Sequence, residues 1–434
     1  MKRTNRTISR RALLKAAAAA GAAPLVARAA APARARKPPP SDRVTLGMIG
    51  LGSMGLRHVK GFLQESGCRI IAVCDVDAVR RRGAAALIDK HYGCGDCAQY
   101  NDFRELLARG DLDAVCIAVP DHWHAVVSIL AVRAGKDIYG EKPLARTIPE
   151  GRAIVRAVQQ AGCVWQTGSW QRSTRHFRFA CELVRNRRIG ELQRVEVGIG
   201  LGHEIGPQPV MPVPEGFDYE MWLGPAPWAP YTEKRCHWNF RWISDYSGGQ
   251  VTDWGAHHVD IAHWGMDADE TGPVSVVGRG EFPEDGLYDE AVRYRFDCEY
   301  ASGVKLHVGS NNYYPQGVRW IGDRGWVHVS RAKVTADPQS LLRTKFAPDE
   351  VRLPRPSGDH RQGHREDFLH CVRTRQRTIS GAEASHRSIA VAHLGNIAMR
   401  LGRKLRWDPQ AERFVSDPQA NRMLSRAMRE PWRL

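Results

Sequence analysis

Val44-Thr45-Leu46-Gly47-Met48-Ile49 runs directly into Gly50-Leu51-Gly52-Ser53-Met54-Gly55, and this stretch decides the fold of the first half of the chain. The apolar residues predict a short buried strand, and the residues after the glycines predict a helix that ends near Glu65. In a dinucleotide-binding loop, glycines allow a tight turn, close approach of the backbone to a pyrophosphate, and close packing of helix on strand. The helix N-terminus adds amide donors and a dipole that favours phosphate. We therefore expect a dinucleotide to contact Gly50, Gly52, Ser53, Met54 and Gly55.

A carboxylate follows the second predicted strand. Residues 70–74 are apolar and end in Asp75, about twenty residues after the glycine loop, where an acid accepts hydrogen bonds from the adenosine ribose hydroxyls. Its charge would repel a 2′-phosphate, which favours NAD. Arg80, Arg81 and Arg82 lie close downstream and weaken that preference, so NADP remains possible.

Strands and helices continue to alternate after Asp75, which predicts a parallel sheet of the Rossmann type. Ligands of such sheets lie beyond the carboxyl ends of the strands. The expected strands span 114–119, 137–140 and 164–167, and the expected helices span 124–134 and 148–161. Pro120, His124, Glu141 and Lys142 follow strand ends, so we expect them at the cofactor crevice. Pro143 stiffens the turn that carries Lys142.

Past Gly168 the pattern becomes one of hairpins, with residues 292–300 and 304–310 flanking one turn and 318–321 and 326–330 flanking another. Antiparallel hairpins with few helices between them predict an open sheet with helices on one face. The predicted fold is therefore α/β followed by α+β: an N-terminal Rossmann domain and an open antiparallel-sheet domain. The uncovered sheet face favours a homo-oligomer.

The segment Gly248-Gly249-Gln250-Val251-Thr252-Asp253-Trp254-Gly255-Ala256-His257 carries the second candidate site. Asp253 and His257 stand four residues apart, so they share one face of a helix. A carboxylate that orients an imidazole makes a competent acid–base unit near neutral pH. An Asp–His pair is also common as a helix cap or a buried hydrogen-bond pair, so the spacing alone leaves both interpretations open.

The motifs GLGSMG at 50–55, AVPDHWH at 118–124 and GEKPL at 140–144, with Asp75 and the Asp-x-x-x-His pair, resemble the Gfo/Idh/MocA family of sugar and cyclitol oxidoreductases. The resemblance covers nearly all of the chain after the first forty residues. It implies that Lys142 lies beside the reacting carbon, and that Asp253 and His257 lie at the substrate site. Gln250 departs from the family pattern, in which a third glycine is common.

An aromatic stretch, residues 222–242, supplies candidate substrate contacts. Aromatic faces stack on the C–H faces of sugars, and nearby cations bind hydroxyls or carboxylates. We expect most of these tryptophans to fix a loop and a few to touch the ligand. The predicted substrate contacts are Gln171, Arg172, Trp238 and Arg241.

The chain begins with Ser9-Arg10-Arg11-Ala12-Leu13-Leu14-Lys15 inside a basic, alanine-rich segment, which resembles a twin-arginine export signal. We expect a signal peptide at 1–29, a linker at 30–40, the Rossmann domain at 41–167 and the substrate domain at 168–434. The expected location is periplasmic, after passage through the twin-arginine translocation machinery. An amphipathic first helix is the alternative. An exported protein would have no cytoplasmic pool of nicotinamide to exchange with, so we expect it to hold NAD tightly.

Charge and cysteine content limit the other function classes. The formal charge is +16, and seven basic residues in the first 29 account for much of it. No basic run is interleaved with aromatics, so we expect no nucleic-acid partner. The apolar stretch at 16–26 is too short for a stable membrane anchor. Among the ten cysteines, Cys94 and Cys97 form a lone CxxC, either a short-loop disulfide or an inert loop.

Three functions remain open from the sequence. The leading one is hydride transfer between a nicotinamide and a secondary alcohol of a sugar, cyclitol or glycoside, with Lys142, Asp253 and His257 as catalytic residues. The alternative is a redox-neutral glycosidase or lyase that acts through a transient keto-sugar. The third is a binding protein that holds the nucleotide without catalysis. A metal cluster of His257, His258 and His263 with Asp253 and Asp260 is a further alternative, but hydride transfer requires no metal, so we expect none.

Overall fold

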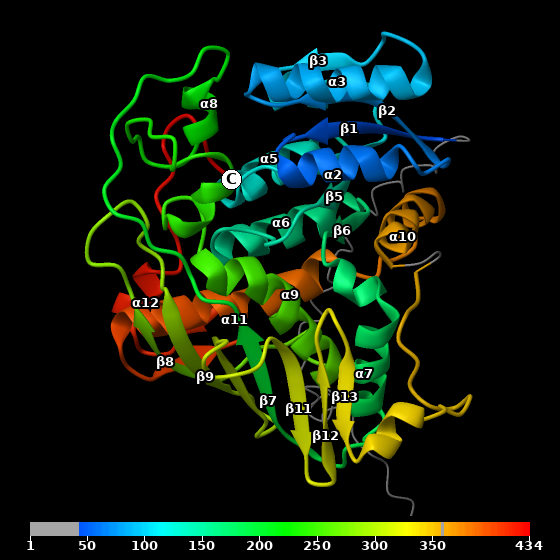
Figure 1. The fold of residues 1–434 in the computed structure, drawn as a ribbon, viewed down its shortest axis with the longest axis vertical. Coiled ribbons are helices and arrows are strands. Elements are labelled where there is room, and N and C mark those ends of the chain that lie inside the picture. The colour runs from blue at the N-terminus through cyan, green and yellow to red at the C-terminus, as the bar shows by residue number, and fades with distance from the viewer. Residues whose placement is uncertain (1–42, 357–359) are drawn as a thin grey trace, which may run out of the picture. The chain divides into compact units, whose positions relative to one another are not determined.

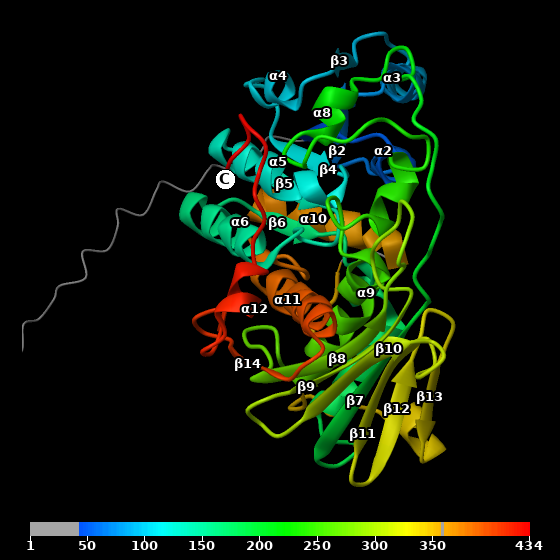
Figure 2. The same cartoon turned by 90° about the vertical axis from the view of Figure 1, so that its left-hand side faces the viewer.

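The structure is a computed structural model that describes residues 43–356 and 360–434. The predicted signal peptide and the predicted linker lie outside the described residues. Figures 1 and 2 show the ribbon in two views, with a parallel sheet in the N-terminal half and a second, larger sheet after it. Within the described residues, no helix combines the length and the apolar character needed to cross a membrane.

The first sheet is parallel, with strand order β3-β2-β1-β4-β5-β6. Its central strands are apolar and buried because helices cover both faces, as the sequence predicts. The strands are β1 (Val44–Ile49), β2 (Cys68–Cys74), β3 (Ala98–Tyr100), β4 (Ala114–Ile117), β5 (Asp137–Gly140) and β6 (Trp165–Thr167). The helices are α2 (Ser53–Phe62), α3 (Ala78–Tyr92), α4 (Phe103–Leu107), α5 (Asp121–Arg133) and α6 (Ile148–Ala161).

Helix boundaries in this half follow capping rules. The side chains of Asp77 and Asp102 accept backbone N–H bonds at the starts of α3 and α4, and Thr147 does so at the start of α6. Helix α5 begins at Asp121, three residues before the expected start, because Pro120 fits the position that precedes a helix. His124 is therefore a helical residue and does not lie in a strand-end loop.

The second sheet has nine strands in the order β13-β12-β11-β7-β10-β9-β8-β14-β15. It is mixed, because β7 and β10 pair in parallel while all other neighbours are antiparallel. The purely antiparallel sheet expected from the hairpins is wrong at this one pair, which joins strands far apart in sequence. The strands are β7 (Leu192–Ile199), β8 (Ser275–Glu281), β9 (Arg293–Glu299), β10 (Lys305–Ser310), β11 (Gly317–Gly322), β12 (Gly325–Val329), β13 (Val334–Asp337), β14 (Leu405–Asp408) and β15 (Arg413–Phe414).

Long helices lie against one face of this sheet and carry the site residues (Figure 2). Helix α9 packs on β7 and β11, and α11 packs on β8 and β9. Gly265 lets α9 approach the sheet, since a Cβ there would lie 2.7 Å from the indole of Trp320. The helices are α7 (Arg175–Arg185), α8 (Tyr219–Leu223), α9 (Gly249–Met266), α10 (His360–Thr374), α11 (Ala382–Leu401) and α12 (Pro418–Arg422), with the 3-10 helices η1 (Trp170–Ser173), η2 (His237–Trp242) and η3 (Gln339–Arg343).

One buried acid makes the stability of this fold depend on pH. Burial and the neighbouring Glu366 raise the pKa of Glu65 from 4.5 to about 7, and Arg365 offsets this in part. The folded state therefore binds more protons than the unfolded state between those values, and stability falls as pH rises through that window. We expect Glu65→Gln to raise the free energy of unfolding at pH 8 by about 1–3 kcal/mol and to change it little at pH 4.

Urea unfolding at both pH values measures this effect. Glu430→Gln is the control, because the Glu430 side chain is 86% exposed. An equal gain for Glu65→Gln at pH 4 and pH 8 would contradict the proposed proton linkage.

Candidate active site

The glycine loop has the geometry that its sequence predicts. Gly50 has a φ of +86°, and a Cβ on it would lie 2.5 Å from the Ala118 carbonyl oxygen. A Cβ on Gly55 would lie 1.9 Å from the Gly50 oxygen, so only glycine fits either position. Gly52 precedes α2, and no side chain caps this helix start. The backbone therefore leaves a cradle at a helix N-terminus that fits a pyrophosphate.

A cavity of about 230 Å³ opens beyond this loop, at the carboxyl ends of β1, β2 and β4. Residues from both halves of the chain line it. Its first-half lining includes Gly50, Gly52, Ser53, Met54, Asp75, Val76, Arg80, Asn101, Pro120, Asp121, Glu141 and Lys142. Its second-half lining comprises Phe217, Met221, Trp222, His237, Trp238, Phe240 and Arg241.

Asp75 lies where the ribose-binding acid was predicted, but its carboxylate also holds the loop. One oxygen accepts from the Leu51 amide at 2.5 Å and the other from the Asp77 amide at 2.8 Å. Burial raises the pKa of Asp75, and these amides oppose that rise. Arg80, which pairs with Asp77, lines the same end of the cavity; a Cβ on Gly52 would lie 3.2 Å from its Nη1. Both cofactor-selecting groups named from the sequence, the acid and an arginine, thus face the cavity.

Lys142, which lines the cavity, meets Asp253, although 111 positions separate them in the sequence. The Lys142 Nζ donates to Asp253 Oδ1 at 2.6 Å and to the Asp253 backbone oxygen at 3.2 Å. Arg241 Nε donates to the same Oδ1 at 3.2 Å. Burial alone would raise the pKa of Asp253, but the two cations outweigh it and lower that pKa. The ammonium is therefore held by an ionised partner at the mouth of the cleft.

His257 lies one turn further along α9 and is 6% exposed. The rings of Trp254 and Trp170 flank it, with centroids at 5.8 and 6.4 Å. Gln171, with its amide in the orientation that satisfies its neighbours, donates to the His257 carbonyl oxygen at 3.1 Å. The Asp253 carboxylate, which the sequence assigned to orient His257, accepts bonds from Lys142 and Arg241.

Arg331, in the β12–β13 turn, is a site residue that the sequence analysis missed. Its guanidinium lies 4.2 Å from the Trp254 ring centroid and 4.9 Å from that of Trp170, and its Nε donates to the Gln171 oxygen at 3.0 Å. It thus reaches the neighbourhood of His257 from a strand turn. No local motif marks an arginine in a hairpin turn, so only the fold identifies it.

Of three further predicted residues, two line the cavity and one does not. Trp238 and Arg241 line the cavity, and the Trp238 side chain is 50% exposed at its mouth. His124 does not line it; its ring nitrogens contact the carbonyl oxygens of Pro143 and Val119 at 2.6 and 2.9 Å, which ties two strand-end loops together. Its predicted cofactor contact is therefore an indirect, positioning one.

Glu141 has a buried partner that the sequence did not indicate. His58 of α2 contacts a Glu141 oxygen at 2.7 Å, and the other oxygen accepts from the Lys142 amide at 3.1 Å. Burial would raise the pKa of Glu141, but His58 and Lys142 lower it. These two contacts of Glu141 link α2 to the backbone that carries Lys142.

Arg172 lies away from the cavity, which corrects its assignment as a substrate contact. Its guanidinium is 2% exposed and makes paired bonds to Asp260 and Asp269, each at 2.8 Å. Burial alone would lower the pKa of Arg172, but the two carboxylates raise it. All its donors except one are thus used inside the second half of the chain, where it joins η1 to α9.

The histidines of α9 do not converge on one point, which removes the metal-cluster alternative. His258 contacts Gln316 at 3.2 Å and His263 contacts the Tyr300 hydroxyl at 2.5 Å. Burial lowers the pKa of His258 to about 3 and that of His263 to about 4. Both are neutral interior residues near pH 7.

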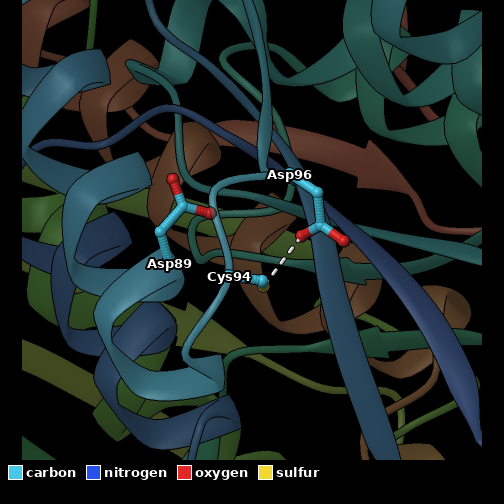
Figure 3. A group of neighbouring side chains, drawn as sticks. All are labelled: Asp89, Cys94 and Asp96. Atoms are coloured by element: carbon cyan, nitrogen blue, oxygen red, sulfur yellow. Dashed lines mark hydrogen bonds between the residues drawn. The ribbon is translucent and has the colours of Figure 1, made fainter.

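A different group, Asp89, Cys94 and Asp96, has donor atoms within 4.8 Å of one another (Figure 3). Its members already have partners: the Cys94 thiol donates to Asp96 at 3.0 Å, Arg69 pairs with Asp96 at 3.0 Å, and Asp89 accepts from the Cys97 amide at 3.0 Å. Cys94 and Cys97 are both free thiols. The arginine and these bonds account for the cluster without a cation.

Comparison with known proteins places both halves in one family. Residues 44–169 match the model of the oxidoreductase family's NAD-binding Rossmann fold, and residues 203–434 match the model of its C-terminal alpha/beta domain. A glycosyl hydrolase family 109 protein of Shewanella sp. (strain ANA-3) is 38% identical over 116 residues, or 26% of this chain and 25% of that protein. An inositol 2-dehydrogenase of Salmonella paratyphi B is 33% identical over 27% of this chain and 33% of its own length. The match thus spans about a quarter to a third of the length of these relatives.

Solved structures share the fold over most of the chain. The WlbA dehydrogenase from Bordetella pertussis, solved with NADH and UDP-GlcNAcA, is 16% identical, with a TM-score of 0.63 over 84% of this chain and 99% of that one. The aldose-aldose oxidoreductase from Caulobacter crescentus, solved with glycerol, is 20% identical, with the same TM-score and the same coverage. At these identities the likeness establishes architecture alone.

Proposed function

Because this chain belongs to the Gfo/Idh/MocA oxidoreductase family and contains its NAD-binding Rossmann domain, we propose that it transfers hydride between a tightly held nicotinamide and a sugar, cyclitol or glycoside secondary alcohol. One observation carries the proposal: the ion pair of 2.6 Å between Asp253 and Lys142, which lines the nucleotide cavity. It brings a cation from the Rossmann half against a carboxylate of α9, beside the indoles that flank His257.

The chain's own residues divide the work of such a reaction. When bound, the nicotinamide supplies the hydride acceptor or donor. Lys142, held by the Asp253 carboxylate that also accepts from Arg241, presents its ammonium to the oxygen of the reacting carbon and stabilises negative charge there. The His257 imidazole exchanges the hydroxyl proton. The indoles of Trp170, Trp254 and Trp238 offer faces for the sugar's C–H groups.

A redox-neutral glycosidase is the second candidate, and the curated relatives named as family 109 glycosyl hydrolases favour it. In that chemistry, oxidation of a hydroxyl to a ketone acidifies the neighbouring C–H, elimination and addition of water replace the glycosidic bond, and the hydride returns to the product. It uses the same site residues and consumes no net cofactor. NAD and NADP are both consistent with Asp75 and Arg80.

One experiment separates the two candidates and tests the proposal. The purified protein is denatured to measure co-purified nicotinamide, and the native protein is given free sugars, cyclitols and aryl glycosides without added cofactor. Reduction of the bound nicotinamide supports hydride transfer, and glycoside cleavage without a net redox change supports the glycosidase. If the protein binds the nucleotide but reacts with none of these compounds, both enzymatic candidates fail. The protein is then a binding protein that holds the nucleotide without catalysis.

We also propose that the protein acts after export by the twin-arginine route, with domains at 41–167 and 168–434 and as a homo-oligomer. The support is the sequence of the first forty residues and the open sheet of the second domain. Sequencing the N-terminus of the periplasmic protein tests the export and the cleavage after Ala29. Light scattering of the purified protein tests the oligomer.

A further inference from the structure

A long loop of the second half reaches back over the nucleotide cavity, and we call residues 203–246 the strap. Its residues 216–218 run beside the end of β2. Asp218 donates its amide to the Val76 oxygen and Ala78 donates to the Gly216 oxygen, both at 2.9 Å. Asn101 Nδ2 adds a side-chain bond to Asp218 Oδ2 at 2.7 Å. The strap is therefore hydrogen-bonded to the Rossmann sheet next to Asp75, at the predicted adenosine end.

The strap has a core of its own, which makes it a preformed wall. Its buried apolar residues form one cluster that packs on Val76. Within that cluster the rings of Tyr219 and Trp222 stack with centroids 6.0 Å apart, and Tyr246 contacts Trp222 at 5.0 Å. The cluster consists of Phe217, Tyr219, Trp222, Leu223, Ala226, Tyr231, Cys236, Phe240, Trp242, Ile243, Tyr246 and Tyr288.

The face of the strap that lines the cavity lies opposite the Rossmann loops. Phe217 and Met221 line it together with Asp75 and Val76, and His237 lines it together with Arg80. Burial and the nearby Arg80 lower the pKa of His237, so it is a neutral surface for a ligand near pH 7. A dinucleotide in this cavity would therefore be covered from the strap side along its length.

The C-terminal segment, residues 424–434, fastens the strap to the Rossmann helices (Figure 2). Arg429 donates to the backbone oxygens of Gly224 and Glu220 at 3.0 and 3.1 Å and pairs with the Glu220 carboxylate at 2.5 Å. Trp432 packs on the first half, with ring centroids 4.6 Å from Trp123 and 6.2 Å from Phe103.

A second arginine anchors the same segment deeper in the first half. Arg426 pairs with the buried Glu150 of α6 at 2.7 Å and donates to the His122 backbone oxygen at 2.7 Å. His122 in turn contacts the Trp222 oxygen of the strap at 3.0 Å, and the Trp123 indole donates to that same oxygen at 3.0 Å. The segment, the strap and α5 thus form one bonded unit over the cavity.

We propose that the strap and the C-terminal segment form a clasp that completes the nucleotide site and holds the dinucleotide bound through repeated turnovers. The clasp rests on the proposed function in one respect, that the cavity binds a dinucleotide. Release of the nucleotide then requires the clasp to open, because the strap walls the cavity from Asp75 to Lys142. Arg429 and Trp432 are positioning residues, since they touch the strap and the helices and do not line the cavity.

The test measures the dissociation rate of NADH from the full chain. The protein is loaded with NADH, excess NAD is added, and the decay of bound NADH fluorescence is followed. Arg429 makes two bonds to strap carbonyls and one ion pair, so we expect Arg429→Ala to accelerate dissociation about tenfold or more. Arg429→Lys keeps the charge but loses the paired donors of the guanidinium. Its NADH dissociation rate should lie between those of Arg429→Ala and the parent protein.

Arg433→Ala is the matched control, because Arg433 belongs to the same segment and its side chain is 82% exposed. Trp432→Ala serves as the second variant, and thermal unfolding of each variant checks its folding. Equal dissociation rates in folded parent, Arg429→Ala and Trp432→Ala would overturn the clasp. Failure of the parent chain to bind any dinucleotide would overturn the proposed function, and the two failures are therefore distinguishable.

Discussion

We expect the replacement of Lys142 with methionine to lower turnover by about a thousandfold while the bound nucleotide content stays near that of the parent. Methionine keeps much of the volume of the side chain but removes the ammonium that donates to Asp253 at 2.6 Å. The variant loses both a charge at the reacting oxygen and the partner of a buried carboxylate. Turnover should fall far more than the Michaelis constant rises, because the lost interaction is made mainly in the transition state.

The matched control is Lys404→Met, because Lys404 is 62% exposed and pairs only loosely with Glu299, at 3.6 Å. Asp253→Asn tests the other half of the pair and should also lower turnover. Steady-state kinetics on whichever sugar, cyclitol or glycoside the parent protein turns over, with nucleotide content measured after denaturation, compares all three variants. Parent-like turnover in Lys142→Met would remove Lys142 from the catalytic machinery.

The Rossmann half was predictable because its signals are local. The strand at 44–49, the three glycines and Asp75 lie within one short stretch, and each has a steric or electrostatic task that few other residues perform. The structure confirms the predicted fold, with buried strands that pair in parallel. Lys142 was placed correctly at a strand end for the same reason. The family resemblance placed Lys142 and Asp253 at one site, but their direct contact was not predicted, since no spacing rule joins residues so far apart.

The cavity's second wall was not predictable from local patterns. The aromatic stretch at 222–242 was expected to fix a loop and to contact a sugar. The strap that contains it reaches the end of β2 through backbone hydrogen bonds at 216–218, which any sequence can make. Arg331 stands in a turn, and only the pairing of β11, β12 and β13 brings it to Trp254. Long-range pairing of this kind leaves little trace in composition or periodicity.

Arg172 shows the opposite kind of error. Its position in the sequence suggested a substrate contact, but the fold buries its side chain. It follows the last Rossmann strand and neighbours Gln171, which does reach His257. One residue further along a 3-10 turn, however, the side chain points into the packing between η1 and α9. Adjacent residues on a helical turn face different directions, so a predicted site segment need not contribute all its side chains.

The position of Arg172 predicts a large loss of stability in a variant. We expect Arg172→Met to lower the free energy of unfolding by about 3–5 kcal/mol, because it leaves Asp260 buried without its cation. Asp260 is 1% exposed and Asp269 has 29% of its side chain exposed, so water can replace the arginine only at Asp269. Urea unfolding, with the slope of the transition held in common, measures the change.

Arg331→Met is the paired comparison, since this arginine lies on the surface beside the site. It should change the free energy of unfolding by about 1 kcal/mol or less and raise the Michaelis constant for the substrate. The two arginines would then separate cleanly, one by its effect on folding and the other by its effect on substrate binding. If Arg172→Met instead left unfolding unchanged and weakened substrate binding, the sequence-based assignment of Arg172 would stand and its burial would need another explanation. Asp260→Asn with Arg172→Met should recover part of the lost stability, because the amide removes the stranded charge.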